Sequence, residues 1–159
     1  MGINFQDIRK LPVDLINKLE TQSDQNSLNS NKFDSEFLLK NEGMSIFCKK
    51  DLVGYILAKI ALDQADIISF IIKKEFRRKK YGTILFTKFA HYLKAKGVEK
   101  IFLEVSKYNI PALNFYFCTG FERVGYRENY YKNKNGNVGA EVLMNSIESI
   151  ILKERPLML

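Results

Sequence analysis

The sequence predicts a single domain, residues 1–159, of the α/β class, with strands and helices packed in layers. Hydrophobic residues make up 46% of the chain and aromatic residues 13%, so a sizeable core can form. Segments with helical spacing alternate with β-rich runs, as in a layered α/β fold. The first strands follow one another without helices between them, and this meander excludes a doubly wound nucleotide-binding fold.

The first quarter of the chain predicts two helices joined by a polar loop. Apolar residues recur at helical spacing from about Val13 to Thr21, directly after a proline, which is common at helix starts. The stretch QSDQNSLNSNKFDSE, residues 22–36, is polar, and Asp34 or Ser35 can cap the second helix. Two interpretations of this loop stay open: a flap over a substrate and an ordinary surface loop.

The rest of the chain predicts six strands and three helices. A helix that begins near Gly82 runs through TILFTKFAHYLKAKG, and a shorter helix is capped by Asn109 and ends at Gly120. The tail 147–159 is predicted to form a peripheral helix that ends before Pro156. The predicted strands span residues 44–48, 51–61, 65–73, 100–106, 121–131 and 140–147.

The net charge indicates the kind of partner, and the cysteine content argues against zinc-binding and disulfide-rich proteins. The net charge of +7 favours an anionic partner, with nucleic acid, an anionic membrane and a small polyanion as alternatives. The two cysteines form no CxxC pair, so neither a zinc site nor a disulfide framework is expected, and the predicted compartment is the cytoplasm. No apolar run has the length of a signal-peptide core or a membrane-spanning helix. Cys118 is interpreted as a buried small residue, and His91 as a surface or packing residue.

The stretch KKEFRRKKYGTILF, from Lys73 to Phe86, has six basic residues among its first eight. It lies between a predicted strand and a predicted helix, where loop amides and the helix dipole can bind an anion. Gly82 lets the backbone approach a phosphate with no side chain between them. The residues alone leave two interpretations, a pyrophosphate cradle and a solvated run of charges.

This stretch resembles the acetyl-CoA-binding motif of the GNAT superfamily of N-acetyltransferases, Arg/Gln-x-x-Gly-x-Gly/Ala, with Arg77 and Gly82 at its two ends. The stretch LEVSKYNIPALNFYFCTGFERVGYRENYY is similar to the second half of that fold, and most to the bacterial ribosomal-protein-alanine N-acetyltransferases (RimI type). The resemblance implies a mixed, mostly antiparallel central sheet flanked by helices. It also implies acetyl transfer to an amine from acetyl-CoA as cosubstrate, without a metal.

The resemblance assigns two catalytic roles. Acetyl transfer to an amine needs a base for the ammonium proton and an acid for the leaving thiolate. The base position falls on Glu104, which alternates with apolar residues in IFLEVS; from the residues alone, a glutamate at a wet sheet surface is an equal interpretation. The acid position falls on Tyr116, for which the alternative is an aromatic residue on the core face of a helix.

The resemblance also implies residues that bind acetyl-CoA and the acceptor. Backbone groups at the end of the central strand would bind the pantetheine arm, and amides of the following loop would bind the pyrophosphate. Tyr130 and Tyr131 would line the acceptor's entry, with a cross-strand aromatic pair as the alternative. The expected coenzyme-binding residues are Phe70, Ile71, Ile72, Arg78, Lys79, Lys80, Tyr81, Gly82, Thr83 and Asn109.

Two departures from the family pattern affect these expectations. Lys80 stands where the motif has its first glycine. The loop amides can still bind a pyrophosphate if the backbone at this position does not require a positive φ. The Trp-containing acceptor-loop motif expected upstream is absent, which leaves the acceptor undefined.

Three functions stay open from the sequence. The first is acetylation of a protein N-terminus, such as that of a ribosomal protein. The second is acetylation of a small amine, a polyamine or an aminoglycoside, for which Glu122, Glu128 and Glu141 would supply an acidic groove. The third is a basic RNA-binding domain on a silent acetyltransferase fold. The joint presence of base, cap and acid candidates disfavours the third, so nucleic acid is not the expected partner. The sequence does not predict the oligomeric state.

Overall fold

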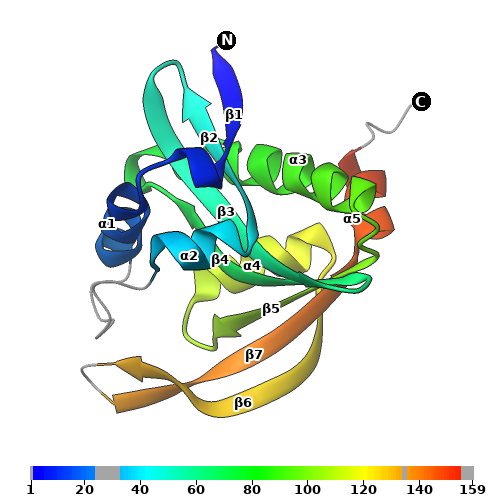
Figure 1. Cartoon of the computed structure of the whole chain (residues 1–159). Helices are drawn as coiled ribbons and strands as arrows, with labels where there is room; N and C mark the ends of the chain where they lie inside the picture. The colour runs from blue at the N-terminus through cyan, green and yellow to red at the C-terminus, as the bar shows by residue number, and fades with distance from the viewer. Residues whose placement is uncertain (1, 24–32, 134–135, 155–159) are drawn as a thin grey trace.

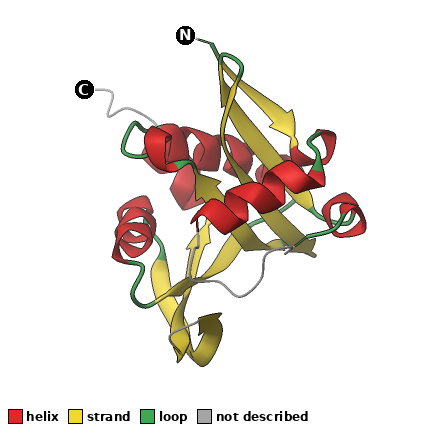
Figure 2. Ribbon diagram, turned by 90° about the vertical axis from the view of Figure 1, so that its left-hand side faces the viewer, coloured by secondary structure: helices red, strands yellow, loops and turns green. Residues whose placement is uncertain are grey.

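Within the part of the chain that the structure describes, one seven-stranded sheet carries helices on both faces (Figures 1 and 2). The structure, a computed structural model, describes residues 2–23, 33–133 and 136–154. The strand order is β1-β2-β3-β4-β5-β7-β6, and neighbouring strands are antiparallel except β4 and β5. The predicted mixed, mostly antiparallel sheet is therefore confirmed.

The strands are β1 (Ile3–Asp7), β2 (Glu42–Cys48), β3 (Asp51–Ala61), β4 (Gln64–Ile72), β5 (Lys100–Ser106), β6 (Glu122–Asn133) and β7 (Gly136–Ser146). The α-helices are α1 (Val13–Ser23), α2 (Ser35–Leu39), α3 (Tyr81–Ala95), α4 (Ile110–Thr119) and α5 (Ile147–Glu154).

The helices α1 and α2 cover one face of the sheet. Ile16 and Leu19 of α1 are buried in the same apolar cluster as Tyr55 of β3. Asp34 caps α2, since its side-chain oxygen accepts a hydrogen bond from the amide of Phe37 at 2.7 Å. The predicted cap is therefore confirmed, with Asp34 as the capping residue.

The predicted loop 22–36 is described only at its two ends, because residues 24–32 lie outside the described part of the chain. At its base, the buried amide of Asn17 donates to the carbonyl oxygen of Phe33 at 2.8 Å and accepts from the amide of Phe33 at 3.0 Å. These two bonds tie α1 to the start of α2. The function of the loop as a flap stays a prediction.

The helices α3, α4 and α5 pack on the opposite face of the sheet. Leu85, Phe89 and Leu93 recur every four residues along α3, so they form one buried stripe. Ile147 and Ile150 of α5 are each only 2% exposed and belong to the same core. The predicted tail helix is therefore present over residues 147–154, and its apolar face packs in the core. The spacing of these isoleucines gives α5 an apolar face, and burying it against α3 and β7 is favourable.

The strand β1 is absent from the elements predicted above. Half-buried Ile3 and Phe5 alternate with exposed Asn4 and Gln6, which is the pattern of a strand. The run is only five residues long, and its pairing partner β2 is remote in the sequence. A pattern this short cannot be separated from chance spacing before the pairing is known.

The strands β4 and β5 pair only over their first four residues, Gln64–Ile67 with Lys100–Leu103. Beyond this point they separate, while β4 stays paired with β3 and β5 with β7. The β3–β4 register shifts at the same place, so that Ile68 is an extra, bulged residue. We call the diverging ends of β4 and β5, residues 68–72 and 104–106, the fork.

Candidate active site

The end of β4 turns alternate backbone groups toward the fork. The amide of Lys73 donates to β3 at 2.8 Å, and bonding pairs alternate along an antiparallel ladder. The backbone groups of Ile71 therefore face β3, whereas those of Phe70 and Ile72 face the fork. Arg77 reaches the carbonyl oxygen of Ile72 from that side, with its Nε 2.8 Å away. Two of the three strand residues predicted to bind pantetheine thus have the necessary orientation.

The loop between β4 and α3 contains two left-handed residues, Arg78 with φ 60° and Lys80 with φ 70°. The condition set for Lys80, a backbone without positive φ, is therefore not met. The lysine adopts the conformation that glycine takes freely, at a backbone cost of about 1 kcal/mol. Left-handed turns of this kind direct backbone amides into an anion-binding concavity.

Positive charge surrounds the N-terminus of α3. Residues 77–80 are all basic and exposed, and α3 begins directly after them. Gly82 lies in the first turn, where an added Cβ would come no closer than 3.6 Å to any neighbour. Packing within the protein therefore does not require glycine here. An added methyl group would be in ordinary contact with the side chains of Phe70, Ile72 and Phe115.

Tyr81 and Thr83, the other two residues of this turn, point in different directions. The hydroxyl of Tyr81 donates to Sγ of Cys48 at 3.3 Å, and this bond raises the pKa of Tyr81. Its side chain is therefore engaged with β2, and its amide is the group left for a ligand. Thr83 is exposed on the outer side of α3.

Glu104 lies at the fork, where β5 leaves β4. Leu103 and Val105 are buried in the core, so alternation along β5 puts Glu104 on the face that carries α1 and α2. Its side chain is 20% exposed, and its Oε1 lies 3.0 Å from Nε of Arg127. The structure thus shows a largely buried, ion-paired carboxylate, not a glutamate on a wet surface.

A bulge in β6 brings Tyr130 to the same place. The β6–β7 register shifts between Arg127 and Tyr131, and Asn129 in this bulge has a φ of 53°. A hydrogen bond between the hydroxyl of Tyr130 and Glu104 raises the pKa of Tyr130. Tyr131 lies in β6, but its side chain lies outside the described part of the structure, so its role stays a prediction.

Tyr116 and Asn109 occupy the two predicted positions on α4. Tyr116 is 7% exposed, and its ring packs against Phe70 of β4 and against Phe121, with centroids 6.5 and 5.4 Å away. The side chain of Tyr116 therefore lies in the core and also contacts the β4 side of the fork. Oδ1 of Asn109 accepts from the amide of Ala112 at 3.3 Å, which confirms the predicted cap.

Two features of this region were not anticipated. Sequence reasoning did not single out Arg127, because its face depends on the register of β6, which a sequence does not display. Cys118, interpreted as buried, is exposed. Leu113 and Tyr116 define the buried side of α4, and a residue two positions after Tyr116 points to the other side of a helix.

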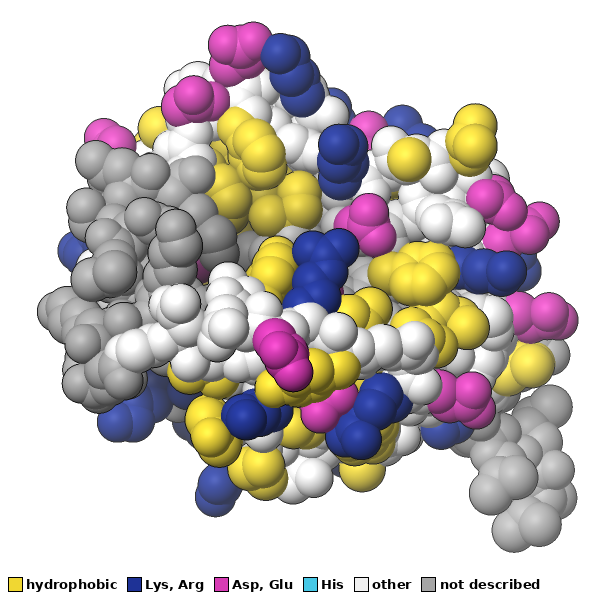
Figure 3. All heavy atoms as spheres, turned by 90° about the horizontal axis from the view of Figure 1, so that it is seen from below, with side chains coloured by type: hydrophobic (Ala, Val, Ile, Leu, Met, Phe, Trp, Pro, Cys, Tyr) yellow, Lys and Arg dark blue, Asp and Glu magenta, His cyan; other side chains and the backbone are white. Residues whose placement is uncertain are grey.

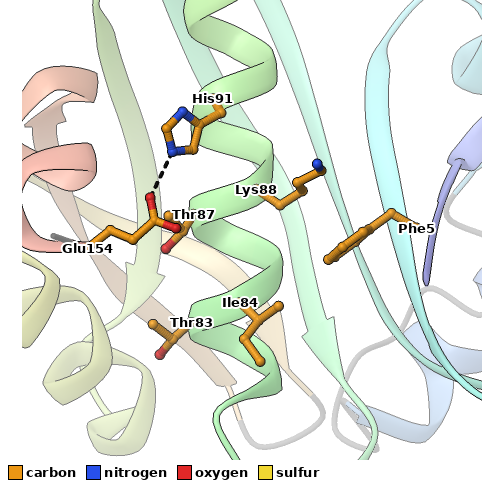
Figure 4. A pocket seen from close by; sticks show the side chains of 7 residues that line it. All are labelled: Phe5, Thr83, Ile84, Thr87, Lys88, His91 and Glu154. Carbon is orange, nitrogen blue, oxygen red and sulfur yellow. Dashed lines mark hydrogen bonds and ion pairs between the residues drawn. The ribbon is translucent and has the colours of Figure 1, made fainter. Parts of the chain in front are cut away.

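A groove of about 450 Å³ runs along the outer side of α3 (Figure 4). Phe5 of β1 and Glu154 of α5 stand on its opposite sides, and Thr83 lies toward the N-terminal end of α3. Nε2 of His91 lies 2.7 Å from Oε2 of Glu154, so His91 links α3 to α5. This agrees with the prediction of a surface or packing residue.

The glutamates expected to form an acidic groove do not share one face of the sheet. Glu141 faces away from the Glu104 side in the β5–β7 register. It is buried 2.7 Å from Nε of Arg123, close enough for an ion pair but not aligned for a hydrogen bond. Glu122 and Glu128 are exposed. On the side seen from below, cationic and anionic side chains mix among apolar ones, so the surface is not predominantly acidic (Figure 3).

Neither a metal cluster nor a membrane span is found among residues 2–23, 33–133 and 136–154. No group of three or more His, Cys, Asp or Glu side chains in these ranges could hold a metal ion. No helix in them is both long and apolar enough to cross a bilayer.

The site thus combines a fork between two parallel strands, a left-handed turn before a helix and a carboxylate at the fork. These groups can bind a phosphorylated cosubstrate and accept a proton. The chain belongs to the acetyltransferase (GNAT) family, whose model matches residues 10–121. It is accordingly an acetyl-CoA-dependent N-acetyltransferase, as the resemblance implied.

The chain is similar in sequence to two named proteins and in structure to a solved enzyme. A ribosomal protein bS18-alanine N-acetyltransferase of Haemophilus ducreyi is 27% identical over 112 residues, which cover 67% of this chain and 77% of the relative. A Bacillus subtilis protein provisionally given the same name is 30% identical over 128 residues, 79% of this chain and 85% of the relative. The crystal structure of the ribosomal-protein-S18-alanine N-acetyltransferase from Escherichia coli superposes with a TM-score of 0.73 at 18% identity, covering 91% of this chain and 94% of its own. This last likeness shows a shared fold.

Proposed function

We propose that this enzyme acetylates the α-amino group at the N-terminus of a protein, such as a ribosomal protein. The observation that carries the proposal is the position of Glu104, a paired and largely buried carboxylate at the point where β4 and β5 separate. The names of the two relatives, at 27% and 30% identity, support a protein N-terminus as the acceptor.

The residues around the fork fit acetyl-CoA, which supplies the activated acetyl thioester. The backbone groups of Phe70 and Ile72 would bind its pantetheine arm as an added strand would be bound. The amides from Arg78 to Thr83 would bind the pyrophosphate, with the exposed cations of the loop adding attraction. Gly82 supports this assignment, because its neighbours would tolerate a Cβ and packing therefore does not explain the glycine. Asn109 would contact the coenzyme from the start of α4.

Two side chains would move protons. Glu104 would accept a proton from the acceptor's ammonium group, directly or through one water, and release the neutral amine as nucleophile. The amide of Phe70, which faces the fork, would stabilise negative charge on the thioester oxygen. As the C–N bond forms and the C–S bond breaks, the nitrogen would lose its second proton to solvent, and Tyr116 would give its proton to the leaving thiolate. A phenol of pKa near 10 can protonate a thiolate whose conjugate acid has a pKa near 8.5 once the site orients them, and solvent then restores both groups.

Binding and acceptor assays test the proposal together. We expect calorimetric titration at moderate salt to show saturable one-to-one binding of acetyl-CoA that ATP, a polyanion control, does not reproduce. We then expect acetylation of a peptide with a free N-terminus and none of the same lysine-free peptide with a blocked N-terminus. Binding without acetylation of the free peptide would contradict the proposed acceptor, and equal binding of ATP would contradict a dedicated coenzyme site.

A further inference from the structure

Arg127 and Tyr130 both contact the carboxylate of Glu104. Nε of Arg127 lies 3.0 Å from Oε1 of Glu104, and its guanidinium lies 5.4 Å from the centroid of the Tyr130 ring. The hydroxyl of Tyr130 is hydrogen-bonded to Glu104 as well. The carboxylate at the fork is therefore held by one cation and one phenol, and these two also contact each other.

The fold of β6 produces this arrangement. In the β6–β7 register Arg127 lies opposite Ala140, which puts it on the same face of the sheet as Glu104. The bulge that follows, with left-handed Asn129, turns Tyr130 back toward the same carboxylate. A regular strand would not place two residues three positions apart on one face. The bulge is therefore required for the joint contact.

We propose that Arg127 is a positioning residue that makes the enzyme select α-amino groups over lysine side chains and polyamines. The inference rests on the proposed function, because it assigns Glu104 as the group that meets the acceptor amine. Arg127 acts through Glu104: it occupies the carboxylate with a fixed positive charge.

The selection follows from charge. The guanidinium repels an ammonium group beside Glu104 and so favours transfer of the ammonium proton to that carboxylate. An α-ammonium gives up its proton readily, whereas a lysine ammonium keeps it and stays repelled. At pH 7.5 an α-amino group with a pKa near 7.8 is about one-third neutral, whereas a lysine side chain with a pKa near 10.4 is only ~0.1% neutral. A polyamine adds further positive charges to the repulsion. The difference in intrinsic pKa already favours α-amino groups over lysine side chains, and the cation beside Glu104 increases this preference.

The test compares acceptors in three forms of the enzyme: wild type, Arg127→Gln and Arg127→Lys. One peptide has a free N-terminus and no lysine; its partner has a blocked N-terminus and one lysine; spermidine is the third acceptor. We expect Arg127→Gln to lower the ratio of kcat/KM for the α-amine to that for the lysine by about five- to tenfold at low salt. Arg127→Lys keeps the charge and should keep the ratio within about twofold. The effect in Arg127→Gln should shrink in 0.5 M salt, because Arg127 is 60% exposed and therefore screened.

Structural and electrostatic roles give different results. If Arg127 only supports the fold, both variants lower kcat/KM for all acceptors equally and the ratio does not move, which overturns the proposal. Arg123→Gln provides a second check: it removes the same charge from β6 but on the face opposite Glu104, where Arg123 lies 2.7 Å from Glu141, so the ratio should stay that of wild type. No turnover of any peptide by wild type would overturn the proposed function along with this inference. Turnover of the free N-terminus with an unchanged ratio in Arg127→Gln would overturn only the role of Arg127.

Discussion

Lys80 adopts a left-handed backbone conformation that lowers the stability of the fold. With φ 70° and ψ 1° it directly precedes α3, and no side-chain cap bond compensates for the strain. Arg78, two residues earlier, is also left-handed. The turn thus keeps its shape with lysine in the position of a motif glycine, and the lysine adds a charge that a glycine would lack.

We expect Lys80→Gly to raise the free energy of unfolding by up to about 1 kcal/mol, because glycine adopts this φ without strain but loses more conformational entropy on folding. Urea unfolding at neutral pH measures the change. Lys79→Gly is the matched control: it removes the same charge from the same loop, and Lys79 is not among the described residues with positive φ. A gain no larger than that of the control would mean that the turn is not strained at Lys80.

At the fork, we expect Glu104→Gln to lower kcat by about a hundredfold or more, because the amide cannot accept the ammonium proton. The dissociation constant of acetyl-CoA should change less than threefold, since the coenzyme is assigned to backbone groups elsewhere. Steady-state kinetics and calorimetry separate the two. Glu128→Gln, at an exposed position in β6, is the control. Turnover unchanged in Glu104→Gln would show that another group is the base.

Among helices and strands, those specified by one short stretch of sequence could be predicted, whereas those that depend on remote pairing could not. The helix that Asn109 caps, with Gly120 (φ 102°) at its end, is specified within one stretch and is confirmed. The strand β1 depends on pairing with β2 and was missed. The candidate base could be named from its motif, but the positions of its partners Arg127 and Tyr130 depend on two register shifts in β6. Bulges change which residues share a face, and no periodic pattern records them.

The role of Gly82 at the N-terminus of α3 can be tested by measuring protein stability and acetyl-CoA affinity separately. We expect Gly82→Ala to leave stability unchanged or slightly raised, because alanine favours helix and its Cβ would meet only ordinary contacts, 3.6–3.7 Å from neighbouring atoms. Acetyl-CoA should bind at least about tenfold more weakly if the pyrophosphate lies against this position, since a methyl group would displace it.

A matched glycine serves as the control for that experiment. A Cβ at Gly125 in β6 would also meet only ordinary contacts, at 3.6 and 3.7 Å, but at a distance from the loop before α3. We expect Gly125→Ala to leave the calorimetric affinity for acetyl-CoA unchanged. If Gly82→Ala binds as tightly as Gly125→Ala, the coenzyme does not approach the backbone at Gly82.

At the scale of the whole molecule, two half-sheets meet at a short join. One half, β1 to β4, is covered by α1 and α2 on one face and by α3 on the other, and the second half is β5, β7 and β6. Only four residue pairs of β4 and β5 connect the halves within the sheet. The fork is a direct result, because two strands that part after four pairs leave backbone groups available for a ligand. Side chains across the core, such as Tyr116 against Phe70, then hold the halves together.

A polar contact that responds to alkaline pH joins α3 to β2, on which this helix packs. Tyr92, near the end of α3, donates to Oε2 of Glu42 in β2 at 2.5 Å. Burial and this bond raise the pKa of Tyr92 to about 12. Tyrosines in the unfolded chain ionise near pH 10, so between pH 10 and 12 the folded chain holds a proton that the unfolded chain has lost. The stability from Tyr92 is therefore complete below pH 10 and is lost as the pH rises toward 12.

We expect Tyr92→Phe to be less stable than wild type at pH 8, by about 1 kcal/mol for the lost hydrogen bond. Above pH 10 the variant should lose stability less steeply than wild type, so that the difference between the two proteins narrows from pH 10 to pH 11.5. Urea unfolding at half-unit steps from pH 8 measures both slopes, and the constant difference below pH 10 serves as the baseline. Burial also raises the pKa of Tyr55, so some alkaline loss should persist in the variant. Parallel slopes for the two proteins would show that the phenol of Tyr92 does not keep its proton in the folded state, and that the contact between α3 and β2 is not the alkaline-sensitive link.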